Sequence, residues 1–394
     1  MPSAHPLLAF LIAALSAMGP FSIDAYLPAF PAMAASLGAS QLQVQQTLTA
    51  YLLAFACMVL WHGALADRFG RRSVLLVSTA VFALASALCA VAPSVEWLWA
   101  GRVLQGLCGG AGMVVGRAVI RDLHEGARAQ RQLSRVMVIF AVAPAIAPML
   151  GAWMLQAGGW RSIFVFLMLF GLALFVLCWF FLPETLAPEA RQPLHPVGLL
   201  RAYVEVLTDR AFVRLGLAIA LNFSGFFIYV LAAPVFVMTH LGLGASDFGW
   251  LFVPAVGGMM LGSMLSGRVA GRWAPRRAIA MGFGIMMFAV LLNVGLALMR
   301  PPGLPWSMIA IPIYTLGMAL AAPSMSLFGL DLFPERRGLA SSCQSFMQTG
   351  VNSLVAGVLA PMLWGSTLTL ALGTGLFLAL SLLALRAPGQ GRLH

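Results

Sequence analysis

The chain has 394 residues, of which 61% are hydrophobic and only 9% charged, with a formal net charge of +11. Soluble domains contain about 25% charged residues, and a chain of this length has too little interior to bury so large an apolar fraction in water. The composition therefore excludes a soluble enzyme, a disordered chain and a disulfide-rich secreted domain. A polytopic helical membrane protein remains.

Twelve apolar segments are long enough to cross a bilayer, which takes about 20 residues each. They lie near residues 7–27, 45–66, 74–92, 98–118, 134–155, 162–182, 212–237, 248–269, 277–298, 304–327, 339–361 and 366–386. The longest hydrophilic stretch lies between the sixth and seventh segments. The sequence thus predicts an N-terminal six-helix half (1–182), a cytoplasmic central loop (183–211) and a C-terminal six-helix half (212–394).

The basic residues indicate the topology. All 23 are Arg, and twenty of them fall on one side of the membrane if the N-terminus is cytoplasmic. Arg161 and Arg300 fall on the other side, and Arg102 lies inside a span. Because positive charge accumulates in cytoplasmic loops, we expect both termini to be cytoplasmic. The net charge then reports orientation, and we expect no nucleic-acid partner.

Asp24 is the only carboxylate well inside a predicted span. An ionisable group at that depth is costly and therefore indicates function, and a carboxyl that switches between charged and neutral forms can carry a proton. Asp24 and Arg102 are predicted at similar depth, so Arg102 would tune the acidity of Asp24. The alternatives are a hydrated Asp24 at the outer interface and an Arg102 that reaches the same interface. His62, Arg117 and Asp331 lie near cytoplasmic helix ends, where we expect hydration.

Four short motifs lie in or directly after predicted spans 1, 2, 4 and 5, and one of them recurs after span 8. Gly63–Arg72 reads G-A-L-A-D-R-F-G-R-R after span 2, and Gly267–Arg277 repeats it 204 residues later without the acid. Span 4 carries R-V-L-Q-G from Arg102 to Gly106, and span 5 carries A-P-A-I-A-P-M-L-G-A over Ala143–Ala152. The end of span 1 reads I-D-A-Y-L-P-A-F-P over Ile23–Pro31.

Together these motifs resemble those of the major facilitator superfamily, and in particular its Bcr/CflA branch of drug:proton antiporters. The resemblance covers nearly the whole chain and implies an all-α major facilitator fold of twelve helices in two pseudo-symmetric halves. It implies proton-coupled efflux of antibiotics and other drugs by alternating access, with Asp24 as proton carrier. It further implies a gating motif and a span-5 hinge or seam against the other half. The gating residues are Gly63, Asp67, Arg68, Gly70, Arg71 and Arg72, and the span-5 residues are Pro144, Pro148 and Gly151.

The alternatives for these two motifs are charges that only set topology and a simple proline kink. Other polar and aromatic residues within spans are candidates for a substrate cavity: Tyr26, Tyr51, Gln105, Asn222, Phe223, Phe226, Tyr229 and Gln348. A cavity of this kind suits a small lipophilic drug-like substrate.

The chain has no P-loop, no HExxH or GxSxG motif, and no metal-ligand spacing among its five cysteines. We therefore expect no enzyme and no cofactor or metal, only a monomer in the lipid bilayer that is driven by the proton gradient. A proton-coupled uptake symporter on the same fold remains the main alternative. An intramembrane enzyme and a solute-sensing receptor are weaker ones.

Overall fold

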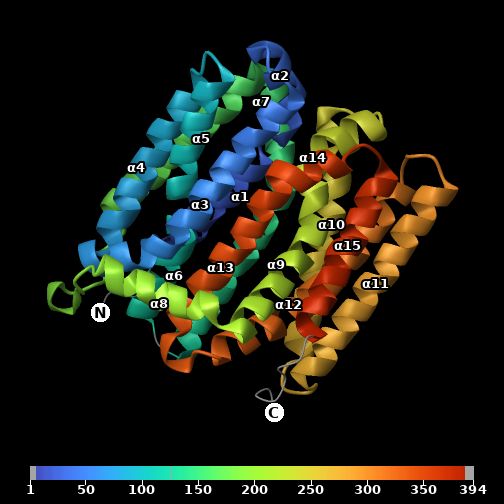
Figure 1. Cartoon of the computed structure of the whole chain (residues 1–394). Helices are drawn as coiled ribbons and strands as arrows, with labels where there is room; N and C mark the ends of the chain where they lie inside the picture. The colour runs from blue at the N-terminus through green and yellow to red at the C-terminus, as the bar shows by residue number, and fades with distance from the viewer. Residues whose placement is uncertain (1–5, 125, 387–394) are drawn as a thin grey trace. The chain divides into compact units, whose positions relative to one another are not determined.

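The computed structural model describes residues 6–124 and 126–386, and the secondary structure of this part is helical, without strands. The chain divides into two compact units, Met1–Pro196 and Val197–His394. Each unit is built from long helices, coloured blue to green and green to red in Figure 1. In the N-terminal unit they are α1 (Pro6–Asp24), α2 (Phe30–Leu37), α3 (Gln41–Phe69), α4 (Arg71–Ala90), α5 (Val95–Gly109), α6 (Ala111–Leu123) and α7 (Gly126–Phe181). In the C-terminal unit they are α8 (Pro196–Thr208), α9 (Arg210–Leu231), α10 (Gly249–Val269), α11 (Pro275–Met299), α12 (Trp306–Asp331), α13 (Arg337–Leu354), α14 (Ala360–Leu363) and α15 (Thr367–Arg386).

Eleven helical segments in the described residues are long and apolar enough to span a membrane. One of them, Val142–Phe181, has 40 residues and contains parts of both predicted spans 5 and 6. A straight helix of that length would measure about 60 Å, twice the thickness of the bilayer core. Its path reverses at Gly159, whose φ of 73° and ψ of −179° are open essentially only to glycine. The segment therefore supplies two spans, and the predicted number of twelve agrees with the fold.

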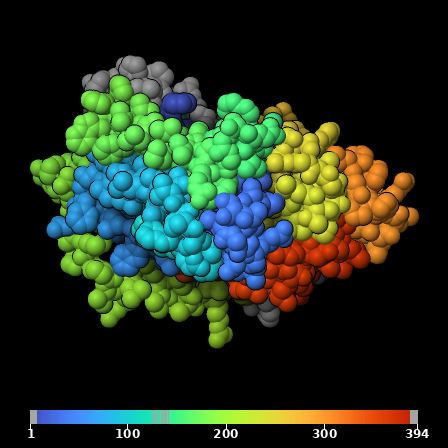
Figure 2. Space-filling view, turned by 90° about the horizontal axis from the view of Figure 1, so that it is seen from above, coloured from blue at the N-terminus to red at the C-terminus, as the bar shows by residue number. Residues whose placement is uncertain are grey.

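The turn at Gly159 lies among the other connections at the same end of the N-terminal unit. The Arg161 guanidinium donates to the Ser36 hydroxyl at 3.4 Å and to the Ala92 carbonyl at 3.0 Å. Figure 2 shows this end from above, where the blue, cyan and green segments of α2, the start of α5 and the turn of α7 adjoin. One of the few Arg residues predicted outside the cytoplasm thus joins three connections.

Glycine allows the helices of the N-terminal unit to pack closely. A side chain at Gly106 would collide with the Tyr51 carbonyl of α3, and one at Gly112 with the backbone of Leu15 in α1. Small residues at such positions are the usual device for close helix packing in membranes. The glycines of span 4 therefore serve close helix packing.

In the C-terminal unit, α9 lies between α12 and α15 and is bonded to both. The Tyr314 hydroxyl of α12 donates to the Asn222 carbonyl at 3.0 Å. The Thr374 and Ser381 hydroxyls of α15 donate to the carbonyls of Gly225 and Ala218, at 3.0 and 2.7 Å. Side-chain hydroxyls that bond to a neighbouring helix backbone fix its register where no water competes.

Candidate functional site

Asp24 lies at a helix break inside the first span. Pro28 lacks the N–H that would bond to the Asp24 carbonyl, so α1 ends at Asp24 and a short 3-10 helix, Leu27–Ala29, follows. The span then continues through α2 to Leu37. Asp24 therefore lies 13 residues before the end of this span. The sequence predicts that the span ends near residue 27, so Asp24 lies deeper in the span than predicted. Only 4% of the residue is exposed.

The span-5 motif contacts the chain directly after Asp24. Gly151 of α7 lies so close to the Ala25 carbonyl that a side chain at Gly151 would overlap it. Pro144 and Pro148 lie within α7, whose one non-helical residue is Gly159. Within the N-terminal unit, this motif therefore packs α7 tightly against the turn that follows Asp24, and the predicted seam against the other half stays a prediction.

Arg102 of α5 is fully buried, between two aromatic rings. Its guanidinium carbon lies 4.4 Å from the ring centres of both Tyr26 and Tyr51. Its Nη1 donates to Gln105 at 2.7 Å, and Gln105 donates to the Ser86 hydroxyl at 2.8 Å. Two aromatic faces attract a cation most strongly where it is desolvated. We define these five residues, Arg102, Tyr26, Tyr51, Gln105 and Ser86, as the Arg102 cluster.

Asp24 and Arg102 do not form an ion pair in this conformation. None of the ion pairs in the described residues includes either of them. The Nε and Nη2 atoms of Arg102 have no hydrogen-bond partner there either. The rings of Tyr26 and Tyr51 lie against the guanidinium instead. The tuning of Asp24 by Arg102 therefore stays a prediction for another conformation.

The motif Gly63–Arg72 forms a network at the end of α3 and the start of α4. Arg71 forms ion pairs with Asp67 at 2.6 Å and with Asp122 of α6 at 3.3 Å. Asp122 also accepts a hydrogen bond from Thr185 at 2.8 Å. Arg72 donates to the Trp179 carbonyl at 2.6 Å. Together these contacts tie α3, α4, α6 and the end of α7 to one another.

A carboxylate occupies the N-terminus of α4, but it is not Asp67. Glu184 accepts from the Arg71 backbone N–H at 2.9 Å, where the helix dipole favours an anion. Gly70, with φ 96°, allows the chain to turn there. Arg68 is exposed, and Gly63 faces Val114 of α6. Asp67 instead forms an ion pair with Arg71 of the same motif, four residues further along the chain.

Asp67→Asn is expected to slow turnover several-fold while leaving equilibrium drug binding almost unchanged. The exchange removes one of the two acids that pair with Arg71, and Asp122 remains to compensate the guanidinium. Because the Asp67 side chain is 42% exposed, we expect the lost pair to cost about 1 kcal/mol of stability or less. The maximal transport rate and drug binding to purified protein measure the two effects separately. Asp331→Asn, which breaks an exposed ion pair with Arg337, is the matched control. Lost binding at an unchanged maximal rate would contradict a gating role.

The predicted cavity residues separate into two groups. Tyr26, Tyr51 and Gln105 all belong to the Arg102 cluster, and the Tyr26 hydroxyl also lies 3.3 Å from that of Thr47. The other five belong to the C-terminal unit. In this unit the Asn222 side-chain amide is buried without a partner in the described residues.

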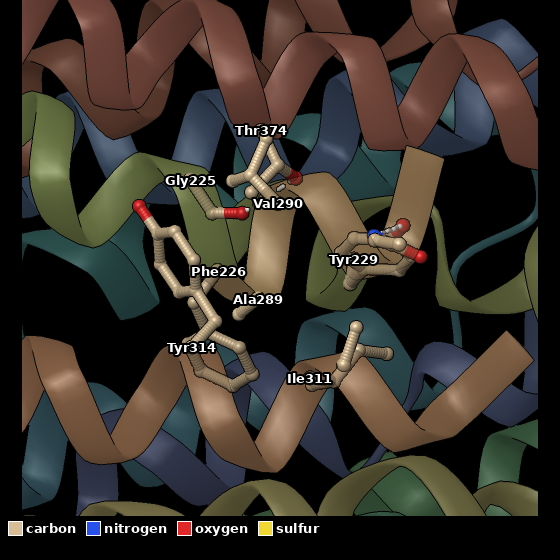
Figure 3. A pocket seen from close by; sticks show the side chains of 10 residues that line it. Gly225, Phe226, Tyr229, Ala289, Val290, Ile311, Tyr314 and Thr374 are labelled. Carbon is tan, nitrogen blue, oxygen red and sulfur yellow. Dashed lines mark hydrogen bonds between the residues drawn. The ribbon is translucent and has the colours of Figure 1, made fainter. Parts of the chain in front are cut away.

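A small pocket lies inside the C-terminal unit between α9, α11, α12 and α15. Its lining includes Phe226 and Tyr229, together with Ile311 and Tyr314 (Figure 3). Asn293 of α11 donates to the Tyr229 hydroxyl at 2.7 Å. The three other predicted residues of this unit, Asn222, Phe223 and Gln348, do not line this pocket. Phe223 packs on Phe227, with ring centres 5.4 Å apart, and Gln348 is partly buried in α13.

Several residues of these networks were not predicted from the sequence. Asn293 is an amide within a span, so its polarity alone marks it as a candidate. Glu184 and Asp122 follow spans 6 and 4, where charges are common and carry no distinct signal. Ser86 is ordinary in a span, and only the fold brings it to Gln105. His62, expected to be hydrated, is 1% exposed.

Eleven helical segments of the described chain that are long and apolar enough to cross a bilayer define a multi-pass membrane protein. Residues 8–357 match the family model described as Major Facilitator Superfamily, and the chain belongs to that superfamily.

Relatives and solved structures agree with this assignment. The chain is 33% identical to an uncharacterized MFS-type transporter, YdgK, of Bacillus subtilis, with 89% of this chain and 87% of the relative covered. It is 26% identical to a bicyclomycin resistance protein homolog of Haemophilus influenzae, with 94% and 93% covered. The solved structure of a D-xylose-proton symporter matches with a TM-score of 0.71 at 14% identity, covering 97% of both chains, which shows a shared fold.

Proposed function

We propose that this transporter exports small, uncharged or zwitterionic drug-like compounds across the bacterial inner membrane in exchange for protons, with Asp24 as the proton carrier. The observation that carries the proposal is the burial of Asp24. It is the only acidic residue among those of described burial that is buried, at 4% exposed, and it lies at a break in a spanning helix. The name of the Haemophilus relative supports a drug as substrate.

The surroundings of Asp24 suit a group that changes its protonation state. A carboxylate buried without a cation is unfavourable, whereas a neutral carboxyl is tolerated, so the conformation described here fits a protonated Asp24. Two nitrogens of the Arg102 guanidinium, Nε and Nη2, make no hydrogen bond among the described residues. Their N–H groups would donate to a carboxylate or to a substrate oxygen after a change of conformation. The Gly151 contact would transmit that change to the turn at Asp24.

The preference for uncharged compounds follows from the charges on the spans. Among the residues of described burial, the N-terminal unit has one buried acid, Asp24, and one fully buried Arg, Arg102. A site with both signs admits a neutral or zwitterionic molecule with little electrostatic penalty, whereas a dication would meet only one negative group.

Inverted membrane vesicles test the proposal directly. A proton gradient imposed on vesicles of wild-type protein, with the lumen more acidic than the medium, should drive accumulation of a phenicol, and addition of the phenicol should release protons from the lumen. Both signals should vanish with a protonophore. Drug movement out of the lumen together with protons would indicate symport and overturn the proposal. Preferential transport of divalent quaternary amines would overturn its substrate class.

A further inference from the structure

His62 is a buried titratable side chain that the mechanism above does not use. It lies on α3, is 1% exposed, and neither ring nitrogen makes a hydrogen bond of good geometry among the described residues, although the Leu107 carbonyl is within reach of the ring. A neutral imidazole carries one donor and one acceptor, and buried polar atoms are nearly always bonded. A histidine with both nitrogens unbonded therefore points to a conformation in which they are used.

The ring of His62 faces the break between α5 and α6. A Cβ at Gly110 would lie 3.4 Å from His62 Nδ1 and 3.3 Å from the Phe55 ring. The Leu107 carbonyl lies nearby, in the last turn of α5. Carbonyls in the last turn of a helix lack their usual N–H partners. A protonated ring would thus find backbone acceptors beside it after a small rotation.

One face of α3 connects His62 with the Arg102 cluster. Tyr51, Phe55 and His62 are spaced by four and seven residues, which places them on the same side of the helix. Tyr51 and Phe55 pack on Gly109, and His62 packs on Gly110. This face of α3 therefore runs along predicted span 4. The eleven residues from Tyr51 to His62 correspond to about 16 Å of helix. Asp67, at the end of α3, is only five residues further on.

No fixed charge holds His62 in one protonation state. The helices packed against α3 are α2, α4, α5 and α6. Their charged and titratable groups are Arg71, Arg72 and Cys89 of α4, Glu96, Arg102 and Cys108 of α5, and Arg117, Arg121 and Asp122 of α6. Within the described residues, none of the hydrogen bonds or ion pairs of these groups goes to His62.

We propose that His62 is a second proton-binding residue of the N-terminal unit, on the path by which protons leave for the cytoplasm. This inference rests on the proposed proton-coupled export. When Asp24 releases its proton, the carboxyl O–H bond breaks, water carries the proton, and an N–H bond forms at the acceptor nitrogen of His62. The imidazolium then returns the proton to cytoplasmic water and becomes neutral again. No other co-reactant takes part.

His62→Gln and His62→Asn in inverted vesicles test this role. The outer pH, which is the cytoplasmic side, is varied from about 5 to 8, the range in which histidine titrates. The lumen pH is shifted in parallel to keep the gradient constant. Wild-type turnover should change across this range, and both variants should lose that change while still binding drug. Phe55→Leu, which alters packing against Gly110 without a titratable group, should keep the wild-type profile.

A wild-type pH profile in either His62 variant would overturn the role of His62. Should neither variant accumulate, wild-type turnover that is constant over the same range would overturn it equally. These outcomes are distinct from failure of the proposed function, which would appear as gradient-driven export that survives in Asp24→Asn.

Discussion

Asp24→Asn is expected to abolish proton-driven export while the protein still folds and binds drug. Asn has nearly the same shape as Asp, and Asp24 takes part in no ion pair of the described residues. The exchange therefore removes the ionisable group and little else. Because a positioned proton-transferring group contributes about 10²-fold or more in rate, gradient-driven uptake into inverted vesicles should fall by at least that factor.

The control for this variant is Glu205→Gln. Glu205 is an exposed acid that pairs with Arg336 at 2.9 Å, and its loss should leave transport unchanged. Drug binding to purified Asp24→Asn, measured without a gradient, should stay close to that of the wild type. A full rate of gradient-driven export in Asp24→Asn would show that another group carries the proton.

Gly151→Ala is expected to inactivate transport even where the protein accumulates. The added methyl group would overlap the Ala25 carbonyl, so α7 and the turn after Asp24 have to separate. Overpacking of this kind typically costs about 1–3 kcal/mol of stability. A displacement of about 1 Å at a reacting group can lower its rate by about 10²-fold. Thermal unfolding in detergent and vesicle transport measure the two effects.

A glycine with open surroundings provides the comparison. No atom lies within 4 Å of a Cβ placed at Gly257 in α10, so Gly257→Ala should unfold and transport like the wild type. Gly151→Leu should accumulate less than Gly151→Ala, because a larger side chain cannot share the same space. Wild-type transport and stability in Gly151→Ala would mean that the contact with Ala25 is not needed.

The spans were predictable because lipid imposes a simple rule. Every crossing needs about 20 apolar residues, so composition along the chain reveals the helices. The junction at Gly159 escapes that rule, because one glycine suffices to reverse the chain and no polar loop separates spans 5 and 6. The described residues contain eleven helical segments long and apolar enough to span a membrane, and the sequence predicts twelve spans. The two numbers differ only because the structure counts the chain on both sides of Gly159 as one segment.

The site was harder to predict than the fold, for physical reasons. Asp24 stands out because an acid in a span is costly, but its depth depends on whether Pro28 ends the span or only breaks it. The partners of Arg102 are aromatic rings from α3 and from the turn after α1, and sequence spacing does not encode contacts between helices. Burial of His62 likewise results from the junction of two other helices.

Most of the segment 183–211, predicted as a cytoplasmic loop, is either bonded to the N-terminal unit or helical. Glu184 binds the start of α4, and the Gln192 backbone N–H donates to the Asp67 carbonyl at 3.1 Å. Helix α8 begins at Pro196. Only the chain between Gln192 and Pro196 is left as a connecting strap. Its four residue-to-residue steps span at most about 14 Å when fully extended. While these anchors hold, the strap keeps the start of α8 within that reach of the end of α3, and lengthening it with Gly-Ser insertions would release this tether without altering a spanning helix.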